Sequence, residues 1–101
     1  MLREEDIQDI HIVPTYAGKR KAWFGFRIGD VRYRFWSIWK KRDGTYFVDP
    51  PKRVCVTNNR PNQYVEYVLF TPEDEEVIQR VVLKKWEEML ERIEKAKESE
   101  N

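Results

Sequence analysis

Arginine and tryptophan side chains alternate with apolar residues along residues 21–36 (KAWFGFRIGDVRYRFW). This alternation predicts two strands, and Gly29-Asp30 between them suits a two-residue type II′ turn. The apolar face would carry Ala22, Phe24, Phe26, Ile28, Val31, Tyr33 and Phe35. The opposite face would carry Lys21, Trp23, Gly25, Arg27, Arg32, Arg34 and Trp36. Arginine binds phosphate groups and flat rings stack on bases, so the second face has the chemistry of a nucleic-acid surface.

The predicted register brings like charges together. Arg27 would lie opposite Arg32, and Trp23 opposite Trp36. Like charges directly opposite each other destabilise a sheet, which favours an anion near the two arginines. The alternative is an ordinary exposed face, kept soluble by arginine and stabilised by a cross-strand tryptophan pair.

Charge is divided unevenly along the chain, although the net charge is only +1. Residues 19–60 hold twelve basic and three acidic side chains, whereas residues 71–101 hold six basic and ten acidic ones. Such segregation steers a polyanion to one side of a protein and repels it from the other. Two basic clusters, Lys40-Lys41-Arg42 and Lys52-Arg53, join the hairpin in the positive region.

The hydrophobic periodicity predicts an α+β fold in a single domain, residues 1–101. Strands are expected at 7–13, 21–28, 31–40, 45–49 and 64–70, with a long loop at 52–63. These give an antiparallel twisted sheet of four to five strands within residues 7–70. A long helix follows over 71–94, with Thr71 as N-cap and Pro72 in its first position, and 95–101 form a polar tail.

The apolar stripe of this helix is longer than the predicted sheet is wide. A helix of about 22 residues spans about 33 Å, whereas four or five strands span about 20–24 Å. Trp86, Met89, Leu90 and Ile93 would then need a partner, so we expect a homodimer through the helix, the sheet edge or both. The alternative is that N-terminal residues or the 52–63 loop cover them.

The composition argues against most catalytic chemistry. The chain has one cysteine, Cys55, and one histidine, His11, and it lacks a glycine-rich phosphate loop. We therefore expect no enzyme activity, no cofactor and no metal site. The sequence shows no apolar signal region and no apolar run of membrane-spanning length, so we expect a cytoplasmic protein.

Four short motifs, in order, resemble the stage V sporulation protein G (SpoVG) family of small bacterial nucleic-acid-binding regulators. They are residues 7–12 (IQDIHI), 36–39 (WSIW) with Asp43-Gly44, 46–53 (YFVDPPKR) and 78–86 (IQRVVLKKW). The resemblance implies a dimer of sheet and helix that binds DNA, and often RNA, as a regulator, nucleoid-associated in a bacterium or archaeon. It also implies that Lys52 and Arg53 are the basic pair of the family.

Together these observations predict a non-enzymatic nucleic-acid-binding protein, with single-stranded DNA or RNA as the ligand. The predicted contact residues are Trp23, Arg27, Arg32, Arg34, Trp36, Lys40, Lys41, Arg42, Lys52 and Arg53. The alternative function is a dimeric protein-interaction or regulatory module whose basic face meets an acidic partner.

Overall fold

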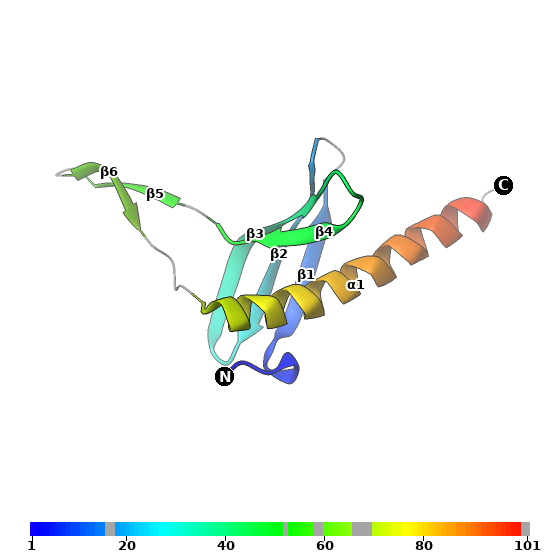
Figure 1. Cartoon of the computed structure of the whole chain (residues 1–101), viewed down its shortest axis with the longest axis horizontal. Coiled ribbons are helices and arrows are strands. Elements are labelled where there is room, and N and C mark those ends of the chain that lie inside the picture. The colour runs from blue at the N-terminus through cyan, green and yellow to red at the C-terminus, as the bar shows by residue number, and fades with distance from the viewer. Residues whose placement is uncertain (16–17, 52, 58–59, 66–69, 100–101) are drawn as a thin grey trace.

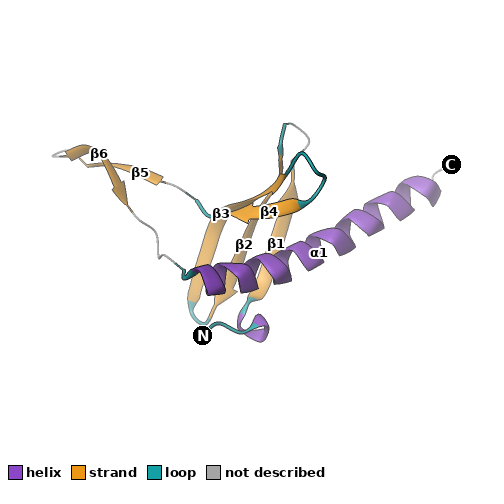
Figure 2. Ribbon diagram, in the orientation of Figure 1, coloured by secondary structure: helices purple, strands orange, loops and turns teal. Residues whose placement is uncertain are grey.

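The computed structural model describes residues 1–15, 18–51, 53–57, 60–65 and 70–99. The fold is α+β: a four-stranded antiparallel sheet is followed by one C-terminal helix, α1 (Pro72–Ser99). The helix crosses one face of the sheet, as Figure 1 and Figure 2 show, and the other face is left open. The predicted fold class is therefore confirmed for sheet and helix.

The sheet has the strand order β1-β2-β3-β4, so each strand pairs with its neighbour in sequence. The strands are β1 (Gln8–Pro14), β2 (Arg20–Ile28), β3 (Val31–Lys40) and β4 (Tyr46–Asp49), and a short 3₁₀ helix, η1 (Glu4–Asp6), precedes them. Ile28 pairs with Val31 across the predicted two-residue turn, where Gly29 has a φ of 57°. Glycine adopts this positive φ without the steric cost that a Cβ would bring.

A β-bulge in β3 changes the predicted register. Tyr33 pairs with Phe26 and Trp36 with Phe24, so two residues of β3, Arg34 and Phe35, lie opposite one residue of β2. Beyond the bulge every side chain of β3 switches face, because successive residues of a strand point in opposite directions. The prediction that Phe35 faces the core and Trp36 faces outward is therefore wrong.

Glycine at position 25 makes this bulge possible. A Cβ added at Gly25 would lie 2.8 Å from the backbone carbonyl oxygen of Tyr33, which is too close for any side chain. The backbone of β3 can therefore approach β2 here only because residue 25 has no side chain. Phe35 completes the bulge with a φ of 64°, a left-handed conformation that costs a non-glycine residue about 1–2 kcal/mol.

The hydrophobic core lies between the inner face of the sheet and α1. Its fully enclosed side chains include Phe26 and Ile38 from the sheet and Ile78 and Val82 from the helix. Trp36 is only 3% exposed and meets the ring of Phe26 edge-on at a centroid distance of 5.2 Å. The indole that was predicted to face outward is thus part of the core.

The start of α1 is capped as the sequence predicts. The Thr71 hydroxyl accepts a hydrogen bond from the backbone N–H of Asp74 at 3.1 Å, and Pro72 is the first helical residue. The helix ends later than predicted, because residues 95–99 continue it instead of forming a polar tail. Within residues 94–99, alanine, lysine and glutamate all favour helix, which outweighs the lack of apolar contacts.

One argument for a dimer fails in this structure. Trp86 is only 3% exposed within the single chain and meets the ring of Tyr46 edge-on at 5.9 Å. Met89 and Leu90 are also packed against the core of the same chain. Trp86 therefore needs no second copy to cover it, and Met89 and Leu90 are already half-buried within the single chain.

The segment predicted as a long loop contains a two-stranded antiparallel ribbon, β5 (Arg53–Thr57) with β6 (Arg60–Val65). The predicted fifth strand at 64–70 overlaps β6 only at residues 64 and 65, and residues 66–69 lie outside the described part. The ribbon forms a separate sheet and does not pair with β1–β4. In the described residues, no helix has the combination of length and apolarity that crossing a membrane requires.

Candidate nucleic-acid interface

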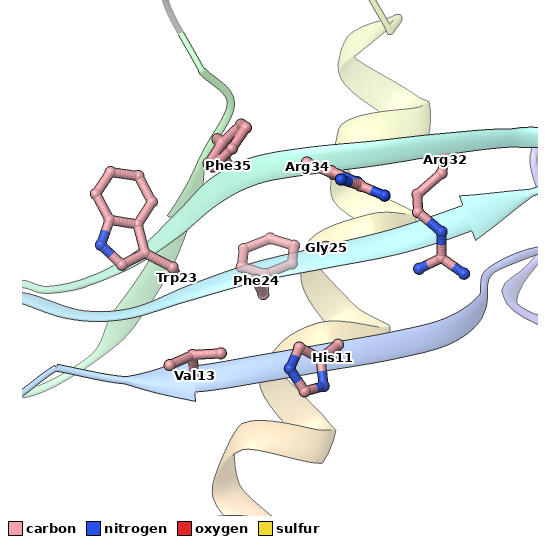
Figure 3. A pocket seen from close by; sticks show the side chains of 8 residues that line it. All are labelled: His11, Val13, Trp23, Phe24, Gly25, Arg32, Arg34 and Phe35. Carbon is pink, nitrogen blue, oxygen red and sulfur yellow. The ribbon is translucent and has the colours of Figure 1, made fainter.

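The open face of the sheet, which we call the outer face, is the side that α1 leaves uncovered. A shallow pocket of about 320 Å³ lies on it, across β1, β2 and β3. Figure 3 shows the side chains around this pocket, with the helix behind the sheet. The lining residues are His11, Val13, Trp23, Phe24, Gly25, Arg32, Arg34 and Phe35.

Two exposed aromatic rings, Trp23 and Phe35, lie at the same end of this pocket (Figure 3). Trp23 is 37% exposed and Phe35 is 68% exposed, which is high for residues of this size. Because the β3 bulge turns Phe35 outward, the second ring of the outer face is Phe35 and not Trp36. The expected Trp23–Trp36 pairing is absent, and Trp23 pairs with Ser37 instead.

The predicted pairing of Arg27 with Arg32 is observed, and the chain itself supplies the anion between them. Asp9 lies in an irregular part of β1 with a φ of 51°. Its Oδ2 accepts a hydrogen bond from Arg27 Nε at 2.7 Å and lies 3.8 Å from Arg32 Nη2. The hydrogen bond and charge of Arg27 lower the pKa of the Asp9 carboxyl. An external anion is therefore not required to explain the two arginines.

The three predicted arginines of the hairpin differ in how many bonds their guanidinium groups make to the rest of the protein. Arg27 also donates to the carbonyl oxygen of Gly29 at 2.6 Å and to Gln8 Oε1 at 3.2 Å, so its guanidinium is largely occupied. Arg32 and Arg34 are exposed and line the pocket. In the described part of the chain, Arg34 makes no ion pair or side-chain hydrogen bond. Arg32 and Arg34 are thus the cations best placed to meet a ligand.

Arg20 contacts two aromatic rings of the outer face, although the sequence analysis did not predict it as a contact residue. Its guanidinium carbon lies 4.0 Å from the ring centroid of Trp23 and 4.9 Å from that of Trp39. The Arg20 Nε is buried and has no hydrogen-bond partner among the described residues. The register of β2 with β3 shifts between Arg20 and Ala22, and Arg20 pairs with Trp39. Such cation–π contacts hold the rings in place.

A second and more basic pocket, of about 480 Å³, lies where the β3–β4 turn meets the segment before β2. The backbone N–H of Lys40 donates to the carbonyl oxygen of Lys19 at 3.2 Å, which ties these two segments together. We call this hollow the basic pocket. It is lined by Gly18, Lys19, Lys21, Trp39, Lys40, Lys41, Arg42 and Phe47.

The predicted cluster of Lys40, Lys41 and Arg42 therefore lines one pocket, but its members point differently. Lys41 Nζ lies 5.7 Å from the ring centroid of Phe47, which pairs with Trp39 on the outer face. Lys40 Nζ lies 5.8 Å from the ring of Tyr46, which packs against Trp86 of the helix. The charge of Lys40 is thus directed toward the helix side of the sheet.

The remaining predicted residues cannot be placed on this surface. Lys52 lies outside the described residues, and Arg53 is described only as the first residue of β5. Sequence reasoning missed Phe35, Arg20 and the pocket wall formed by His11 and Val13. The one usable signal for the bulge was Gly25, an isolated glycine inside a strand pattern.

The described residues contain no group of three histidine, cysteine, aspartate or glutamate side chains that could hold a metal ion. No protein-family model matches the chain, and no curated protein or solved structure matches it either. The resemblance to the SpoVG family therefore remains a prediction from four short motifs.

Proposed function

We propose that the protein binds single-stranded nucleic acid on the outer face of its sheet, without catalysing a reaction. The observation that carries the proposal is the juxtaposition of two exposed rings, Trp23 and Phe35, with the exposed arginines Arg32 and Arg34 around one pocket. Rings provide stacking surfaces for bases, and arginines provide charge for the phosphates that link them.

The conformation of Phe35 supports a role in binding. A phenylalanine that is 68% exposed gains little from burial, and its φ of 64° is unfavourable for a residue with a side chain. Backbone strain of this kind is concentrated at functional sites, where it positions a group for a ligand. A base stacked on Phe35 would cover the ring and offset both costs.

The shape of the surface favours unpaired over paired strands. The outer face is a sheet with only shallow hollows, and its rings can reach bases only if those bases are unstacked. The single long helix begins with Glu73, Asp74 and Glu75, so it is poorly suited to enter a major groove. DNA and RNA both carry the bases and phosphates that this face can hold.

Fluorescence anisotropy with labelled oligonucleotides tests this proposal. We expect single strands to bind more tightly than duplexes of the same sequence, and log K to fall with log salt. Two phosphate contacts, at Arg32 and Arg34, predict a slope of about −1.4 for a single strand. Absence of single-strand binding at low salt would contradict the proposal.

A pair of variants separates the role of the rings from the stability of the fold. The double variant Trp23→Ala/Phe35→Ala removes two stacking surfaces, each worth about 1–3 kcal/mol per base, so affinity should fall at least tenfold. Both residues are exposed, so the circular dichroism spectrum should not change. The matched control is Val31→Ala, which removes an exposed apolar side chain that does not line the pocket.

A protein-interaction module with an acidic partner is the second candidate. Val13 is 48% exposed and lines the same pocket as the two rings, so it adds to the apolar surface there. An acidic peptide would use the arginines but would not require flat rings. Strong binding of a polyglutamate peptide, unaffected by Trp23→Ala/Phe35→Ala, together with weak oligonucleotide binding, would favour this second function.

A further inference from the structure

The basic pocket differs in composition from the pocket beside Phe35. Four cationic residues besides Lys40 line it, namely Lys19, Lys21, Lys41 and Arg42, and among the described residues no acidic one does. Asp43 is the nearest acidic residue in sequence, and its carboxylate binds within the β3–β4 turn. Its Oδ1 accepts hydrogen bonds from the hydroxyl of Thr45 at 2.6 Å and from the backbone N–H of Thr45 at 2.9 Å. The positive charge of the pocket is thus not neutralised by a carboxylate of its own lining.

Two aromatic rings accompany these cations. Trp39 and Phe47 pair across β3 and β4 and both line the pocket. Two contacts hold the Trp39 indole in place. Its Nε1 donates a hydrogen bond to Ser37 Oγ at 2.8 Å, and the guanidinium of Arg20 lies over its ring. The pocket therefore combines a positioned ring, which can stack on a base, with several positive charges, which can bind a phosphate. This combination suits a nucleotide with its phosphate.

The basic pocket lies on the same outer face as the Phe35 pocket. The Trp23–Arg20–Trp39 contacts link the two hollows, because Trp23 lines the first and Trp39 lines the second. A nucleic-acid strand that stacks on Trp23 can therefore reach Trp39 along the surface that Trp23, Arg20 and Trp39 form. The basic pocket lies at the end of this path, beside the β3–β4 turn.

We propose that the basic pocket holds the phosphorylated end of a nucleic-acid strand, with the last base against Trp39 and the terminal phosphate among Lys21, Lys41 and Arg42. This inference rests on the proposed function of the outer face. A terminal phosphomonoester carries close to two charges at neutral pH, whereas each internal phosphodiester carries one. A hollow lined by several cations and no acid therefore favours the terminal group more strongly.

Oligothymidylates of one length test this inference, carrying a 5′-phosphate, a 3′-phosphate or hydroxyl groups at both ends. A hydroxyl-ended strand two nucleotides longer, which carries two more phosphodiester charges, controls for the charge that a terminal phosphate adds. We expect one of the two phosphorylated strands to bind about tenfold more tightly than both hydroxyl-ended strands, because charged hydrogen bonds to the phosphate are gained. Which end is preferred assigns the polarity of the strand on the sheet.

Variants locate the effect in the basic pocket. Lys41→Gln/Arg42→Gln should remove the preference for a phosphorylated end, while Lys84→Gln/Lys95→Gln, the same charge change on exposed positions of α1, should retain it. The preference should also shrink as the pH is lowered from about 7.5 to about 5.5, because the phosphomonoester then loses its second charge.

The outcomes distinguish this inference from the proposed function. Equal affinity for the phosphorylated strands and the longer hydroxyl-ended strand would overturn the inference and leave the proposed function intact. A preference that survives Lys41→Gln/Arg42→Gln would also overturn it. Failure of all four strands to bind would contradict the proposed function, and this inference with it.

Discussion

At the scale of single residues, Asp9 limits the positive charge of the outer face. Its carboxylate bonds to Arg27 and lies near Arg32, in the place where a phosphate of a bound strand would meet these side chains. The left-handed φ of 51° at Asp9 is part of the irregularity that brings the carboxylate there. A bound phosphate must therefore compete with a group of the protein itself.

Replacing Asp9 with asparagine should strengthen nucleic-acid binding. The change frees Arg27 for about one more phosphate, so log K should depend on log salt more steeply by about 0.7, with about fivefold tighter binding near 0.1 M salt. Anisotropy titrations across a salt series measure both quantities. The control is Asp30→Asn, which removes an exposed acid from the same hairpin. Equal effects of the two changes would show that net charge, and not the position of Asp9, is responsible.

The same ion pair predicts a small pH dependence of stability. The pKa of Asp9 is lowered in the folded chain, by the hydrogen bond from Arg27 first and then by its charge. Asp9 therefore stabilises the fold above its unfolded pKa, and this contribution is lost as the pH falls through the folded value. Denaturant unfolding should show wild type more stable than Asp9→Asn at pH 7 and the two nearly equal in strong acid. A difference that stays constant with pH would contradict the ion-pair explanation.

At the scale of elements, the β3 bulge decides which aromatic rings lie on the outer face. It turns Phe35 outward and Trp36 inward, and it depends on the absence of a side chain at Gly25. One extra residue in β3 thus divides the hairpin into two halves. Near the turn, the side chains of β3 point as simple alternation predicts, and beyond the bulge they point to the opposite face of the sheet.

Gly25→Ala should destabilise the protein through this bulge. The new Cβ would lie 2.8 Å from the Tyr33 carbonyl oxygen, a backbone atom that cannot move without shifting the strand. We expect a loss of about 1–3 kcal/mol in the free energy of unfolding, measured by chemical denaturation. A midpoint equal to or above that of wild type would mean that β3 approaches β2 less closely than the structure indicates.

The sequence was sufficient for the four strands of the main sheet and for the start of the helix, but not for the β5–β6 ribbon or for the fine register of the sheet. Alternation predicted β2, β3 and the turn at Gly29, and the Thr71-Pro72 cap predicted the start of α1. Alternation alone cannot reveal a bulge, because Phe35 and Trp36 are both large aromatic residues that suit either face. The sequence likewise could not show that Asp9, eighteen residues from Arg27, would be its partner, because strand pairing brings them together.

At the scale of the whole molecule, the two faces of the sheet differ in burial and composition. The inner face and α1 form the core, and the outer face carries exposed rings and arginines. The helix starts in an acidic first turn, so the positive outer face and the acidic start of the helix belong to opposite sides of the sheet. Under the proposed function, this distribution of charge would direct a polyanion to the open face.

The expected homodimer is a separate prediction at this scale. Light scattering after size exclusion should give a mass of about twice the 12.4 kDa of one chain. Since Trp86 is covered within the chain, a helix-mediated dimer would have to use positions nearer the C-terminus, such as the half-buried Ile93. Ile93→Glu should then produce monomers, whereas a dimer through the edge of β1 or β4 would be unaffected. A wild-type mass of one chain would contradict the prediction.

The central claim is that a nucleic-acid strand lies on the outer face of the sheet. The most direct measurement is an NMR titration of the isotope-labelled protein with a short oligothymidylate, in which shifts of backbone amides and tryptophan indoles are followed. We predict the largest shifts at the Trp23 indole and at the amides of Arg34 and Phe35, with small shifts along α1. Shifts concentrated on α1, or no shifts at a saturating oligonucleotide concentration, would contradict the claim.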